Sequence, residues 1–233
     1  PRRKQWAPSR LLLPLASSLP FLAGTFSSHQ GYSEAPIDRV LGERFPLAKS
    51  VTANTLESMV FLNNGDSFSA IPLPEEAQWA PASGIVSADF DGDGDEDLFL
   101  AQNFFATRTG VSRLDGGRGL MMLGDGTGKF EVLLPSRAGI AIYGDQRAAA
   151  AGDFNQDGQL DLIVTQNRAQ TKLYQNKGAS HGLRVRLLGP PGNPMAIGAQ
   201  VRMANGTNFG PAREIHGGSG YLSQSSSELV FHG

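Results

Sequence analysis

One acidic nine-residue pattern occurs twice in this chain, and it constrains the fold more than any other feature. Residues 89–97 read DFDGDGDED and residues 153–161 read DFNQDGQLD, an offset of 64 positions (153 − 89). Both copies carry oxygen-bearing side chains at positions 1, 3, 5 and 9, with glycine at position 6. An apolar segment follows each copy, and both segments end in Gln-Asn. Such a repeat indicates a fold built from similar units that pack against each other.

Short apolar or alternating segments, bounded by Gly, Asp and Asn, flank the acidic loops and predict β-strands. In the first repeat we expect strands near 84–90, 97–103, 119–124 and 129–134, while residues 58–73 would supply the last two strands of a preceding unit. Four antiparallel strands per repeat are typical of a propeller blade. We therefore expect a mostly β fold, a partial β-propeller of about two to three four-stranded blades. Because so few blades do not close a ring, we expect a fragment of a larger protein.

Three regions are expected along the chain: a short helical or irregular N-terminal segment (1–57), propeller-like repeats (58–180) and a small β domain (181–233). In the first region Ile37, Val40 and Leu41 have helical spacing, between a proline and a glycine. A basic start and the apolar run 11–24 leave two interpretations open, a secretion signal or an internal helix, and the helix that follows favours the second. Proline interrupts this run, which is too short to span a membrane, so we predict no membrane insertion.

The acidic loops have the composition of a cation site. Alternate residues of a tightly turning backbone can direct oxygens at one centre, and hard oxygen ligands without nitrogen or sulfur favour Ca²⁺. Position 7 would contribute its backbone carbonyl. Neither loop is an EF-hand, because position 12 is apolar. The alternative is a solvated acidic turn, but the first loop crowds six acids into nine residues, which would repel each other without a cation. We predict two Ca²⁺ sites, with these ligands: Asp89, Asp91, Asp93, Asp95 and Asp97 in the first, and Asp153, Asn155, Asp157, Gln159 and Asp161 in the second.

Composition argues against several other classes of site. Without cysteine the chain has no disulfide, Cys-ligated zinc or thiol nucleophile. A net charge of -2 argues against a nucleic-acid partner. The four histidines are scattered, and no nucleophile and base converge, so we predict no catalytic residues and no enzymatic activity. Arg184 and Arg186 alternate along one segment, which predicts a solvated face.

Two resemblances extend this interpretation. The loops, with the turns Asn63–Asp66 and Leu123–Gly126, resemble FG-GAP/VCBS repeats, the Ca²⁺-loop blades of integrin-α-type β-propellers, over roughly residues 58–180. The tail, with Gly192-Asn193-Pro194 and the segment 213–224, resembles the ASPIC/UnbV domain that follows such repeats in exported bacterial proteins. That family usually continues beyond the equivalent of Phe231, so the resemblance predicts a truncated domain.

The resemblance implies Ca²⁺ binding, an extracytoplasmic or secreted location, and a role in recognition of a protein or glycan, in adhesion or as a scaffold. It implies no known reaction. The alternative is an enzyme, a polysaccharide lyase or hydrolase, that uses the propeller as its scaffold and has its site in blades outside this chain.

Overall fold

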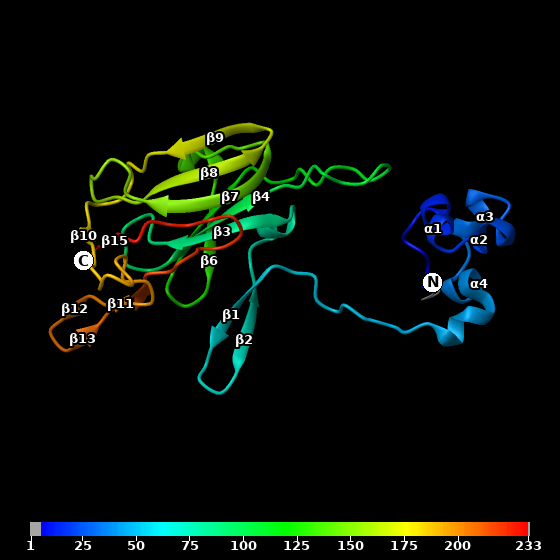
Figure 1. Cartoon of the computed structure of the whole chain (residues 1–233), viewed down its shortest axis with the longest axis horizontal. Helices are drawn as coiled ribbons and strands as arrows, with labels where there is room; N and C mark the ends of the chain where they lie inside the picture. The colour runs from blue at the N-terminus through cyan, green and yellow to red at the C-terminus, as the bar shows by residue number, and fades with distance from the viewer. Residues whose placement is uncertain (1–5, 233) are drawn as a thin grey trace. The chain divides into compact units, whose positions relative to one another are not determined.

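The computed structural model describes residues 6–232, which form a mostly β structure with 30% strand and 16% helix. The chain divides into two compact units, Pro1–Leu56 and Glu57–Gly233 (Figure 1). The first unit is helical, and the second contains the antiparallel sheets together with two short helices, η2 Glu75–Gln78 and α5 Pro135–Ala138. The coarse prediction of a mostly β protein with a helical N-terminal segment is therefore confirmed.

In residues 6–56 the first unit contains five short helices: α1 Leu12–Ser18, α2 Leu22–Thr25, α3 His29–Ser33, α4 Ile37–Leu41 and the 3-10 helix η1 Gly42–Leu47. Their apolar side chains form a small core of Leu12, Leu22, Phe26, Tyr32, Ala35 and Val40. The predicted helix at residue 37 is confirmed, and it ends at Gly42, whose φ of 55° suits glycine. The apolar run forms α1 and α2, with Pro20 between them. Within residues 6–232, none of the helices has the length and apolar character needed to cross a membrane.

A four-stranded antiparallel sheet contains the first repeat. Its strands are β3 Ala82–Ala88, β4 Asp97–Gln102, β5 Leu120–Gly124 and β6 Phe130–Leu133, and they pair in chain order. All four lie within two residues of the predicted ranges at each end. The predicted strands of residues 58–73 form a separate hairpin, β1 Met59–Asn63 with β2 Phe68–Pro72. Because β3 ends at Ala88 and β4 begins at Asp97, the first acidic loop connects these two strands (Figure 1).

The second repeat forms a three-stranded sheet of β7 Asp145–Gly152, β8 Asp161–Asn167 and β9 Ala169–Tyr174. The prediction of four strands in every repeat is wrong here. After β9 the chain turns at 176–178, and its next strand, β10 Leu183–Val185, pairs with β15 Leu229–Phe231 instead of with β9. Across residues 6–232 the strands form six separate antiparallel sheets, and no ring of blades is formed.

The two repeat sheets share one hydrophobic core, which includes Val86, Phe99 and Met121 from the first sheet and Ala149, Leu162 and Val164 from the second. Glycine at position 84 lets β3 approach β7 closely, because a Cβ there would lie 3.2 Å from the Ala149 nitrogen. A side-chain amide also joins the repeats, since Asn176 Nδ2 donates to the Phe90 carbonyl at 2.6 Å. The two acidic loops consequently belong to one packed structure.

Small strand pairs form the C-terminal region: β10 with β15, β11 Gln200–Val201 with β14 Arg213–Glu214, and β12 Ala204–Asn205 with β13 Asn208–Phe209. The segment 223–226 runs beside β7, where Ser226 N donates to the Ala151 carbonyl at 2.9 Å and the Ser225 hydroxyl accepts from Ala151 N at 3.2 Å. These contacts cover backbone groups at the open edge of the second sheet. The C-terminal region thus packs onto the repeats within the same compact unit.

Candidate metal centre

Three carboxylates of the first loop lie together. Oxygens of Asp89, Asp91 and Asp97 are all within 4.8 Å of one another. Asp89 and Asp97 are fully buried, while Asp91 is exposed to solvent. Buried carboxylates are costly unless they are paired, hydrogen-bonded or bound to a metal. This cluster could hold a metal ion.

Glycines shape the loop around Asp89. Gly92 and Gly94 have φ of 81° and 99°, a left-handed conformation that side-chain-bearing residues avoid. Gly92 N donates to Asp89 Oδ1 at 2.8 Å, and Gly94 N donates to Oδ2 at 3.2 Å. The backbone therefore curls around the carboxylate at position 1, as the glycine at position 6 predicts.

Asp97, at position 9, holds the loop closed. Its Oδ2 accepts from Phe90 N at 2.7 Å and Asp91 N at 3.3 Å, and its Oδ1 accepts from Gly124 N at 2.9 Å. Burial raises the pKa of Asp97 to about 6, although the hydrogen bonds from Gly124 and Phe90 act in the opposite direction. The Asp97 carboxylate thus connects the loop to the end of β5.

Gly124 is needed at that contact because a Cβ there would overlap the Glu96 carbonyl oxygen. We expect Gly124→Ala to lower the free energy of unfolding by about 2 kcal/mol, since backbone atoms must separate and the hydrogen bond to Asp97 weakens. Urea denaturation measures the change. Gly178→Ala is the matched control, with no atom nearer than 3.7 Å to the added carbon, and it should change stability little. Equal effects of both changes would contradict this packing argument.

The other predicted ligands of the first loop lie outside the cluster. Asp93 is exposed, and its Oδ1 accepts from Asp95 N at 2.9 Å. The Asp95 carboxylate lies against Gly126, in the turn that follows β5. Burial raises the pKa of Asp91, and the neighbouring charges of Asp93 and Asp89 raise it further. The structure thus gathers three of the five predicted residues.

Two hydrogen bonds of the first loop recur at equivalent positions in the second, and both carboxylates at position 9 also accept from a backbone amide beyond their loop. Gly158 N donates to Asp153 Oδ2 at 2.9 Å, as Gly94 does to Asp89. Phe154 N donates to Asp161 Oδ2 at 2.9 Å, and Asn176 N donates to Asp161 Oδ1 at 2.8 Å. The repeat seen in the sequence is therefore also a repeat of loop geometry.

Side chains at positions 3 and 7 distinguish the second loop from the first, since Asn155 and Gln159 replace Asp91 and Asp95. Asn155 Nδ2 donates to Asp157 Oδ2 at 2.7 Å, and this bond holds the pKa of Asp157 below its usual range. Gln159 is buried, and its side-chain oxygen has no hydrogen-bond partner among the described residues. Within residues 6–232, only the first loop brings three acidic or histidine side chains within 4.8 Å of one another.

Arginine and histidine side chains from the C-terminal region reach the loops, and the sequence did not predict these contacts. Arg213 Nη2 lies 3.3 Å from Asp89 Oδ2, and His232 Nδ1 lies 3.0 Å from the same oxygen. Arg184 Nε lies 2.9 Å from Asp153 Oδ2, so the predicted solvated face is wrong for this arginine. The available signal was the charge distribution: outside the loops, 13 acids (22 − 9) face 20 Lys and Arg residues.

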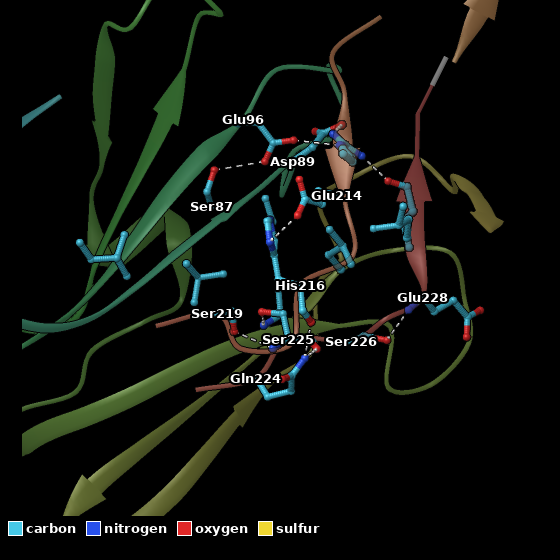
Figure 2. Close-up of a pocket in the computed structure, with 18 of the residues that line it drawn as sticks. Ser87, Asp89, Glu96, Glu214, His216, Ser219, Gln224, Ser225, Ser226 and Glu228 are labelled. Atoms are coloured by element: carbon cyan, nitrogen blue, oxygen red, sulfur yellow. Dashed lines mark hydrogen bonds and ion pairs between the residues drawn. The ribbon is translucent and has the colours of Figure 1, made fainter. Parts of the chain in front are cut away.

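A cavity of about 550 Å³, lined by both polar and apolar side chains, lies beside the first loop, between β3 and the C-terminal region. Figure 2 shows His216 and Glu214 directed toward each other in it, with Nδ1 and Oε1 3.5 Å apart. Ser87 donates to Glu96 at 3.2 Å on the β3 side. Serine hydroxyls and the Gln224 amide are thus among the groups that line this cavity, which borders Asp89.

Comparisons with known proteins add no family to this description. No protein-family model matches the chain, and no curated protein is found to be similar to it. Inferences about function therefore depend on the loops and on what surrounds them.

Proposed function

We propose that this chain is a calcium-binding repeat protein of the FG-GAP/VCBS type, in which Ca²⁺ stiffens the acidic loops of stacked, blade-like sheets. The cluster of Asp89, Asp91 and Asp97 is the observation that carries the proposal. A four-stranded antiparallel sheet with its acidic loop between the first two strands supports the comparison with a blade of a partial β-propeller.

The residues of the first loop fit Ca²⁺ in chemistry. All three clustered side chains offer carboxylate oxygens, and Ca²⁺ accepts irregular arrangements of such ligands better than Mg²⁺ does. When bound, the cation neutralises carboxylates that otherwise repel one another. In the second loop Asp153, Asn155, Asp157 and Asp161 would hold a second ion more weakly, because fewer charges are present.

The biological role proposed for this calcium-stiffened structure is recognition of a protein or glycan, in an extracytoplasmic or secreted setting, with an ASPIC/UnbV-type C-terminal region. The cavity beside the first loop supports a recognition role, since its serine hydroxyls, Gln224 and His216 offer both hydrogen-bond donors and acceptors. A glycan array and a pull-down with the calcium-loaded chain test this role, and the absence of any ligand in both would count against it.

Calcium titration of the metal-stripped chain is expected to show two sites, with the tighter one at the first loop. At a free concentration of 100 times the dissociation constant, each ion should raise the free energy of unfolding by about 2.7 kcal/mol. Calorimetry and thermal melts measure these effects. Asp91→Asn is the matched variant, because asparagine can still accept from Asp93 N but has no charge, and it should weaken only the tighter site. No heat and no shift in Tm would exclude calcium binding.

A further inference from the structure

Both acidic loops are contacted in the same way by the C-terminal region. An arginine that is distant in sequence lies against the aspartate at position 1: Arg213 on Asp89 and Arg184 on Asp153. The two aspartate side chains are 0% and 2% exposed, so each arginine lies against a buried carboxylate. One such contact could be incidental, but the same arrangement at both repeats requires a common explanation.

Arg213 is fixed in position by several partners. Its Nε donates to Glu96 Oε1 at 2.8 Å, and its Nη1 donates to the Val230 carbonyl. The guanidinium also lies over the Phe231 ring, 5.0 Å from the ring centre. Only 11% of the side chain is exposed. A guanidinium held between Asp89 and Glu96 neutralises part of the loop's charge without any metal.

Arg184 contacts the second loop more loosely. Its Nη2 lies 2.6 Å from Glu228 Oε1, and its Nε lies 2.9 Å from Asp153 Oδ2 without the alignment of a hydrogen bond. The side chain is 28% exposed. The contact with Asp153 is therefore mainly an attraction between charges, which solvent screens in part.

We propose that Arg213 and Arg184 are internal competitors of the loop cations, so that metal binding and attachment of the C-terminal region oppose each other. The inference rests on the proposed calcium binding. Asp89 Oδ2 has two lone pairs and already accepts from Gly94 N and Arg213 Nη2, while His232 Nδ1 lies 3.0 Å away. A cation that binds this oxygen must displace a donor, and one that binds Oδ1 lies beside a guanidinium of like charge.

Competition of this kind has a reciprocal consequence. If the arginine weakens calcium binding, calcium must weaken the hold of the arginine by the same factor. Calcium should therefore loosen β10 and β14, which carry Arg184 and Arg213, and β15, which Arg213 contacts, while it stiffens the acidic loops. In the absence of metal the arginines would keep the loops folded.

Arg213→Gln and Arg184→Gln test the proposal in the full chain, with Arg186→Gln as the matched control because Arg186 is exposed and next to the same strand. Calcium is titrated while hydrogen exchange is followed by mass spectrometry on peptides that cover residues 89–97 and 153–161 separately. We expect R213Q to tighten binding at the first loop, and R184Q at the second, each on the order of tenfold. R186Q should leave both affinities unchanged.

The outcomes separate this inference from the proposed calcium binding. Unchanged or weaker affinity in R213Q and R184Q, with normal binding by the wild type, would overturn the competition and leave calcium binding intact. If R213Q and R184Q bind calcium but the wild type does not, the competition is supported, and calcium binds only to loops from which the arginine has been removed. No binding by any chain would overturn both. If R213Q does not fold, two other measurements test the competition. R184Q must bind calcium more tightly at the second loop, and calcium must speed the hydrogen exchange of residues 181–188 in the wild type.

Discussion

Replacing Asp97 with alanine is expected to abolish metal binding at the first loop and to lower the free energy of unfolding by about 4 kcal/mol. The carboxylate is fully buried and accepts hydrogen bonds from the backbone amides of Phe90, Asp91 and Gly124. Alanine leaves these amides without their partner inside the protein, at a cost of about 1–3 kcal/mol each, partly offset because no charge remains buried. Urea denaturation in a chelating buffer and calcium calorimetry measure the two effects.

Asp161→Ala provides the comparison within the same molecule. Asp161 occupies the equivalent position of the second loop and accepts from Phe154 N and Asn176 N. It should lose binding at the second loop only, and it should cost less stability because fewer amides are left unpaired. A D97A chain that binds two calcium ions would show that position 9 is not a ligand.

Stability in a chelating buffer is expected to fall as the pH rises from 4 to 7, through the ionisation of Asp97. Its folded-state pKa of about 6 lies above the ordinary value of 3.8 for aspartate. Between these two values the folded chain keeps a proton that the unfolded chain has lost. Protonated Asp97 thus adds roughly 3 kcal/mol to the free energy of unfolding. This contribution is fully present below pH 4 and is lost as the pH rises past 6.

Asp97→Asn isolates this contribution, because asparagine does not titrate. Urea denaturation from pH 4 to 7 measures the free energy of unfolding of wild type and D97N. The difference between the two should change by roughly 3 kcal/mol over this range, because the pH dependence from all other carboxylates is the same in both chains. A difference that stays constant with pH would mean that burial does not raise the pKa of Asp97. In calcium the dependence should weaken, since the cation favours the ionised carboxylate.

Local patterns in the sequence predicted much of the fold. The acidic loops and the glycine turns bound short apolar segments, and those boundaries correctly located β1 to β6. The helix at Ile37 followed from its spacing and from the glycine at its end. The equivalent roles of Asp97 and Asp161 likewise follow from the 64-residue repeat.

Features that depend on contacts between distant segments could not be predicted. Nothing near Arg213 in the sequence indicates a partner 124 residues away, and the pairing of β10 with β15 replaces the expected fourth strand of the second sheet. The direction of the Asp95 side chain depends on the turn at Gly126, in another part of the sheet. Spacing indicates which residues can point inward, but packing decides which of them do.

The hydrogen bond from Asn176 to the Phe90 carbonyl has a consequence for how the protein unfolds. It joins the turn after the second sheet to the acidic loop of the first, across 86 positions of sequence. Asn176 also donates its backbone amide to Asp161 of the second loop. Local opening at this turn would release both hydrogen bonds at once, so it should speed amide exchange in both loops, in addition to the openings of each loop alone.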